Sequence, residues 1–275
     1  MKIKKRLYYY VSLLVIVVLA MILLKNIGTR KPKIPGFSRD YAQIIESGEL
    51  NVVTDYNSIG YFVSGDSIEG FQYEMMRKLE RDWGVRINVF LENSLSENWN
   101  GLLMHKYDIV SRNIPVNSAL RDSFAFTTPI TLNKLVLVQR RTEFNDSIPP
   151  IRQHLDLAKK TIVVARNSPA ILRLQNLSHE IGDTIFIRED ETYGEEQLTM
   201  MVAAGDIDFT VCDEVVAKQL AEQFSEIDVE TDISFTQLES WAVRKDSPVL
   251  LDSLNAWLSR YLKSSEFKET YKKYY

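Results

Sequence analysis

The sequence predicts an α/β fold with two similar lobes, and three observations lead to this class. Short apolar runs that suit buried strands alternate with amphipathic stretches that suit helices, an order typical of a largely parallel sheet covered by helices. The second half of the chain repeats the plan of the first. About 235 residues follow residue 40, which is enough for two lobes with separate cores.

The first half begins with a short helix around Tyr41 and continues with alternating strands and helices. The spacing predicts a helix over 70–83, because its apolar residues recur every four positions and Gly84 follows it. Residues 85–91 alternate between apolar and polar side chains, as a half-buried strand does. The other expected elements of this half are strands at 50–54, 107–111 and 135–138 and a helix at 95–103.

The second half opens with a strand at 161–165 and a helix whose first turn contains Pro169. Asn167 or Ser168 precedes that proline and can cap the helix. Ser247 and a proline after it start a long amphipathic helix in the same way. Further strands are expected at 184–188, 207–212 and 240–244, and further helices at 193–204, 214–224, 248–262 and 264–275.

The N-terminus carries a hydrophobic run that predicts a membrane anchor. Residues 7–24 contain no charged residue, and this length is near the minimum for a bilayer span and long for a signal-peptide core. No Ala-x-Ala pattern of a cleavage site ends the run. We therefore expect an uncleaved single-pass helix within residues 1–30 and a linker over 31–40. A cleaved signal peptide with an unusual site is the alternative.

Charge and cysteine usage exclude several classes of function. Residues 1–30 hold six of the 33 Lys and Arg and none of the 37 Asp and Glu, so the remainder has a formal net charge of −10. Such an acidic domain is a poor partner for nucleic acid. Basic residues before the apolar run favour the cytoplasm and leave the bulk of the chain in the periplasm. Cys212 stands alone, and the three histidines lack metal-ligand spacing, so we expect no disulfide, metal site or cofactor.

One segment, residues 108–130, carries the clearest motif. It contains a buried strand, a polar turn, the isolated Arg121, and a second apolar segment that ends at Pro129. A guanidinium is a planar fork of donors that can grip a carboxylate with two bonds. With Ser118, Arg121, Phe126 and Pro129, the segment resembles the ligand-binding signature of the bacterial extracellular solute-binding proteins of family 3.

Other phrases extend this resemblance over residues 48–275, including 48–55, 70–74 and Asp213 with Glu214. The resemblance implies a two-lobed, type II periplasmic-binding-protein fold with a hinge, in which closure of the lobes encloses the ligand. Lobe 1 would comprise residues 41–139, completed by 241–275, and lobe 2 would comprise residues 140–240.

The resemblance also implies roles for individual residues. Arg121 would clamp a ligand carboxylate, with Asn113 and Ser118 adding hydrogen bonds, and Asp213 would pair with an amino group. The alternatives are a solvated arginine and ordinary helix caps at Ser118 and Asp213.

The remaining candidates have equally ordinary alternatives. Ser168 and Asn167 would offer a hydroxyl group and helix N–H groups to an anion, although both also suit plain capping. Tyr56 and Tyr61 would form a wall of the pocket, although packing within a lobe is the alternative.

These expectations describe a membrane-anchored, periplasm-facing protein that captures a small carboxylate-bearing ligand for sensing or transport. The ligand would be an amino acid or a peptidoglycan-derived peptide, and the anchor leaves room for a membrane or cell-wall partner protein. Val116 and Gln72 depart from the family pattern of amino-acid binders. Two alternatives stay open beside a non-enzymatic binding protein: a dehydratase-like enzyme that uses an acid such as Glu74, Asp55 or Glu239, and a scaffold with a degenerate site.

Overall fold

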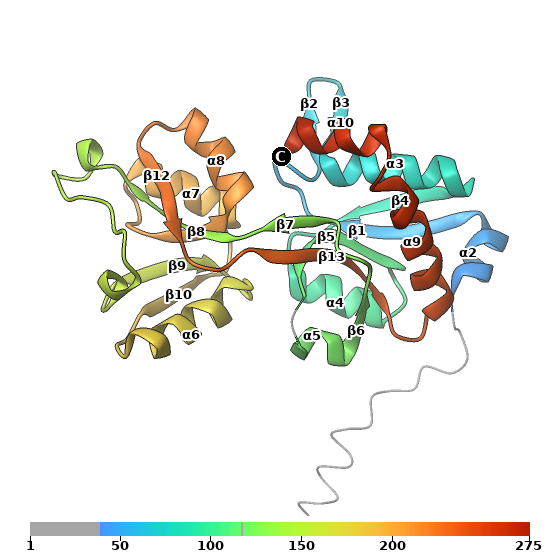
Figure 1. Ribbon diagram of the computed structural model, residues 1–275, viewed down its shortest axis with the longest axis horizontal. Coiled ribbons are helices and arrows are strands. Elements are labelled where there is room, and N and C mark those ends of the chain that lie inside the picture. The colour runs from blue at the N-terminus through green and yellow to red at the C-terminus, as the bar shows by residue number, and fades with distance from the viewer. Residues whose placement is uncertain (1–38, 117) are drawn as a thin grey trace, which may run out of the picture. The chain divides into compact units, whose positions relative to one another are not determined.

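Two mixed sheets organise the protein, as Figure 1 shows in a computed structural model that describes residues 39–116 and 118–275. The first sheet has the strand order β4-β1-β5-β13-β6, with β7 also paired to β13, and the second has the order β10-β9-β11-β8-β12. We call the part built on the first sheet lobe 1 and the part built on the second lobe 2. The two-lobed α/β fold expected from the sequence is confirmed.

Lobe 1 contains most of the first half of the chain and its last two helices. Its strands are β1 (Glu49–Thr54), β4 (Arg86–Leu91), β5 (Ile109–Pro115), β6 (Phe124–Phe126), β7 (Thr131–Asn133) and β13 (Gln237–Arg244), with a hairpin of β2 (Phe62–Ser64) and β3 (Ser67–Glu69). Its helices are α2 (Tyr41–Ser47), α3 (Phe71–Trp83), α4 (Leu95–Leu103), α5 (Ser118–Ser123), α9 (Pro248–Tyr261) and α10 (Ser265–Tyr274).

Lobe 2 contains the middle of the chain. Its strands are β8 (Leu135–Arg140), β9 (Thr161–Ala165), β10 (Phe186–Asp190), β11 (Thr210–Asp213) and β12 (Ile227–Asp232). Its helices are α6 (Ala170–Ile181), α7 (Glu195–Ala204) and α8 (Glu214–Gln223), with short 3₁₀ turns η1 (Thr142–Phe144) and η2 (His154–Leu157).

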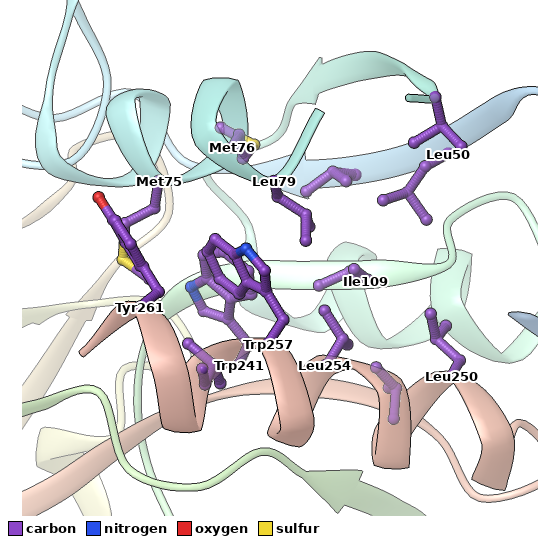
Figure 2. Packing of buried hydrophobic residues seen from close by; sticks show 14 of the residues in the cluster. Leu50, Met75, Met76, Leu79, Ile109, Trp241, Leu250, Leu254, Trp257 and Tyr261 are labelled. Atoms are coloured by element: carbon purple, nitrogen blue, oxygen red, sulfur yellow. The ribbon is translucent and has the colours of Figure 1, made fainter. Parts of the chain in front are cut away.

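The core of lobe 1 lies between its sheet and the helices α3 and α9. Figure 2 shows Met75 and Leu79 of α3 and Leu254 of α9 meeting across side chains of the sheet. The apolar side chains of α3 that recur every four positions in the sequence therefore pack in this core. The rings of Trp241 and Trp257 stack with centroids 6.3 Å apart, and each indole N–H has a polar acceptor, as buried tryptophans require.

Lobe 2 buries both faces of its sheet. In β8, Leu135 and Leu137 pack into the cluster under α6, whereas Val136 and Val138 pack into the cluster under α7 and α8. A strand buried on both faces is apolar at every position. This explains why residues 135–138 read as one continuous apolar run.

The chain passes between the lobes at two positions, and the strand pairing shows that neither lies at the expected boundaries, 139/140 and 240/241. The chain leaves the first sheet after Asn133, because β8 pairs with β11 and β12 of lobe 2. It returns between β12 and β13, over residues 233–236. The two connections run together, since Asn133 pairs with Gln237. An apolar run such as 135–138 suits a central strand of either sheet, and only the pairing decides which.

The expected membrane anchor at residues 1–30 and the linker up to residue 38 lie outside the described residues. Within 39–116 and 118–275, no helix combines the length and apolarity needed to cross a bilayer.

Candidate functional site

A cavity of about 160 Å³ lies between the two lobes, and we call it the interlobe cavity. It forms where the carboxyl ends of the parallel strands β1, β9 and β11 meet, the usual place for a ligand in open α/β sheets. Among its lining residues, lobe 1 supplies Asp55, Tyr56, Gln72, Arg112, Asn113 and Tyr275, and lobe 2 supplies Asn167, Ser168, Glu195, Glu196 and Asp213.

The lobes contact each other directly beside this cavity. The backbone N–H and the hydroxyl of Ser58 in lobe 1 donate to Glu196 Oε1 in lobe 2, at 2.7 and 2.6 Å. Asn167 Nδ2 of lobe 2 donates to Ser96 Oγ of lobe 1 at 3.3 Å. The protein is therefore in a closed arrangement, held by its own polar groups.

Two neighbouring carboxyl groups of lobe 2, those of Asp213 and Glu195, line the interlobe cavity. Desolvation in this enclosed space, followed by the charge of neighbouring Glu195, raises the pKa of Asp213 well above its usual range. Desolvation also raises the pKa of Glu195, although the Arg112 guanidinium opposes the shift. The hydroxyl of Ser168 donates to Glu195 Oε1 at 3.3 Å. The protein thus supplies too little positive charge near these carboxyl groups to balance both of them in their ionised form.

Arg112 is the guanidinium that lies deepest in the interlobe cavity. Its side chain is 18% exposed, against 60% for Arg166, the other arginine in the lining. Its terminal nitrogens reach Asp55 Oδ2 at 3.1 Å and the backbone oxygen of Asn93 at 3.1 Å. The guanidinium is therefore held in place, and it faces the same cavity as Asp213.

Five of the eight residues expected from the sequence line the interlobe cavity: Tyr56, Asn113, Asn167, Ser168 and Asp213. Tyr61 does not, since it is 8% exposed in the core of lobe 1, with its ring edge-on to Tyr73 at 5.6 Å. Packing within the lobe, the alternative reading for Tyr61, accounts for its position.

Arg121 also lies apart from the lining of the interlobe cavity. It is exposed on α5, whose first residue is Ser118, and the side chain of Ser118 is outside the described residues. The reason lies in β5, which runs to Pro115 instead of ending near residue 111. The longer strand brings Arg112 to the cavity and starts α5 beyond it, so Arg112 and not Arg121 lines the cavity.

Sequence reasoning missed Arg112, Glu195 and Tyr275. Arg112 had one usable signal, because it directly follows an expected strand, where ligand-binding groups gather in α/β sheets. Glu195 starts a helix that follows a strand, but the same position suits an acidic residue in any first helical turn. Tyr275 had no local signal, because it meets Asn113 from the other end of the chain.

Comparisons with known proteins agree with this architecture. The family model of the bacterial extracellular solute-binding proteins, family 3, matches residues 50–275. Among solved structures, a mutant of ArgBP from T. maritima has a TM-score of 0.72 at 20% identity, covering 85% of this chain and 97% of that one. An ancestral arginine-binding protein bound to arginine also has a TM-score of 0.72, at 18% identity, covering 83% and 98%. At these identities the likeness shows the fold alone.

Curated relatives match by sequence over most of this chain. Membrane-bound lytic murein transglycosylase F of Pseudomonas fluorescens is 26% identical over 85% of this chain and 47% of its own length. The protein of the same name from Shewanella halifaxensis is 28% identical over 62% of this chain and 34% of its own length. The chain thus spans between a third and a half of the length of these relatives. The family match covers both lobes, and the chain belongs to the bacterial extracellular solute-binding proteins, family 3.

Proposed function

We propose that this protein captures an amino acid or a peptidoglycan-derived peptide in the interlobe cavity by lobe closure, for sensing or transport. The observation that carries the proposal is a closed cavity with acids on lobe 2 and a held guanidinium on lobe 1. A ligand with an amino group and a carboxylate would engage both lobes at once. Such a ligand stabilises the closed state because it binds that state better than the open one.

Asp213, with Glu195 beside it, would receive the amino group. A carboxyl group whose pKa is raised by desolvation gains most from a cation placed against it, since the cation restores the charged form. Arg112 would receive the carboxylate in place of Arg121. Its low exposure and existing partners fix the guanidinium before the ligand arrives, which lowers the entropy cost of binding.

The similar proteins support the same ligand class. One similar structure is of an arginine-binding protein bound to arginine, and the matched relatives are lytic murein transglycosylases. The excess of acids over Arg112 in the interlobe cavity also favours ligands with additional positive charge. Arginine, lysine and murein peptides are therefore the first compounds to test.

Asp213→Asn is expected to weaken binding of the ligand by about 1.5–3 kcal/mol, roughly ten- to a hundredfold, because a charge-assisted hydrogen bond to the amino group is lost. The measurement is thermal unfolding with and without arginine, lysine and a murein tripeptide, where a hundredfold excess over Kd stabilises by about 2.7 kcal/mol. Asp208→Asn, at a lobe 2 side chain that is 75% exposed, is the control. Equal stabilisation of both variants would show that Asp213 does not receive the amino group.

We also propose that residues 7–24 anchor the protein in the inner membrane with its lobes in the periplasm. The support is the uncharged 18-residue run and the basic residues before it. The full chain is expected to stay in the membrane fraction after alkaline extraction. Release of the whole population into the soluble fraction would contradict the anchor.

A further inference from the structure

We propose that Tyr275 forms a wall of the interlobe cavity and thereby sets the size limit of the ligand. Solutes that are larger than the bound ligand by one aromatic ring would be excluded. The inference rests on the proposed function, because it concerns the same cavity. Tyr275 directly follows α10, the last helix of lobe 1, yet its side chain lines a cavity otherwise formed by segments much earlier in the chain.

Aromatic packing fixes the plane of the Tyr275 ring. It stacks on Tyr271, with centroids 4.8 Å apart and an interplanar angle of 12°. It also meets the edge of Phe71, at 5.0 Å and 73°. Phe71 is fully buried at the start of α3, so the ring rests on a rigid part of lobe 1.

A chain of hydrogen bonds fixes the hydroxyl of Tyr275. Asn113 Nδ2 donates to Tyr275 Oη at 2.5 Å, and Asn113 Oδ1 accepts from Gln72 Nε2 at 2.8 Å. Gln72 Oε1 in turn accepts from Trp241 Nε1 at 2.7 Å and from Ser111 Oγ at 3.0 Å. Gln72, Trp241 and Ser111 are all at most 2% exposed. A buried polar network of this kind gives each member a single position.

The wall therefore cannot withdraw without breaking both the stacking and this network. Burial raises the pKa of Tyr275, so the phenol stays neutral at any physiological pH. The interlobe cavity itself measures about 160 Å³. An apolar cavity of about 150 Å³ accommodates one benzene molecule, so the closed cavity has no room for a further ring. Of the two ligand classes proposed above, this size favours the amino acid over the peptide.

The test compares two matched pairs of probes in the full chain. L-alanine and L-phenylalanine differ by one ring, as do L-lysine and Nε-benzyl-L-lysine, and each pair keeps the same charged groups. In wild type, the smaller member is expected to bind at least about tenfold more tightly, by calorimetry. In Tyr275→Ala the dissociation constants of the two members of each pair are expected to differ by no more than about twofold. Tyr275→Phe, which keeps the ring, is expected to retain the wild-type preference.

Tyr271→Ala is the matched control, because Tyr271 packs on the Tyr275 ring but does not line the cavity. If Tyr271→Ala abolishes the preference as fully as Tyr275→Ala does, helix packing sets the limit and the inference is overturned. If Tyr275→Ala does not fold, Tyr275→Leu gives the same comparison with less loss of packing. An unchanged preference in the folded variant overturns the inference alone. If neither small probe, nor arginine or a murein tripeptide, binds wild type, the proposed function is overturned and this inference with it.

Discussion

Replacing Asp108 by alanine is expected to lower the free energy of unfolding by about 3–5 kcal/mol, the cost of breaking a buried ion pair from one side. Asp108 is fully buried, and its carboxylate accepts from Arg39 Nε at 3.0 Å, from Arg244 at 3.3 Å and from the N–H of Asn51 at 2.9 Å. Its loss would leave Arg244, whose side chain is 3% exposed, without its buried carboxylate partner. The damage would fall at the base of β1 and β5, the strands that carry Asp55 and Arg112.

Urea unfolding of wild type, Asp108→Ala and Asp246→Ala would measure this cost. Asp246 also faces Arg244, at 3.5 Å, but it is 60% exposed, and exposed pairs contribute about 0–1 kcal/mol. Both variants remove a carboxylate from the same arginine, but Asp108 is buried and also accepts from Arg39 and Asn51. Similar losses in both would refute the claim that the buried pair carries the stability.

Glu239→Gln is expected to stabilise the protein by about 3 kcal/mol at pH 8 and to change little near pH 4. Burial raises the pKa of Glu239 from its ordinary 4.5 to about 7. The folded state thus binds the proton more tightly, so the stability from protonated Glu239 is full below pH 4.5 and is lost as the pH rises through 7. At about 1.36 kcal/mol per pH unit, that difference amounts to about 3 kcal/mol. Glutamine stays neutral and can still accept from Thr131 Oγ1, which now donates to Glu239 Oε2 at 2.9 Å.

Urea unfolding at several pH values between 4 and 8 would test this directly. The control is Glu230→Gln on β12, the strand that precedes β13 in the chain, because the Glu230 side chain is 76% exposed. The difference between Glu239→Gln and wild type should widen steadily with pH, whereas the control should follow wild type. A constant difference across the range would mean that the pKa of Glu239 is the same in the folded and unfolded states, so that burial does not raise it.

Local sequence patterns predicted some helices and strands of this fold and missed others. The helix predicted over 70–83 is α3, and the strand predicted over 50–54 is β1 with one more residue, because each has a side-chain period set by its own residues. The short strands β6, β7 and β12 were not predicted, since three to six residues with mixed polarity carry little period. The positions of the crossings between the lobes depend on the sheet in which β8 pairs. That pairing involves residues far away in the sequence.

The sequence by itself determined the class of the fold, the family, and the residue types that gather at strand ends, including Asp213 and Ser168. Only the tertiary structure decided that Arg112 and not Arg121 lines the interlobe cavity, that Glu195 lies beside Asp213, and that Tyr275 meets Asn113, 162 residues away in the chain. The physical reason is that periodicity reports contacts within one element. A cavity is made by side chains from several elements, and their meeting depends on strand pairing, strand length and packing that no single segment encodes.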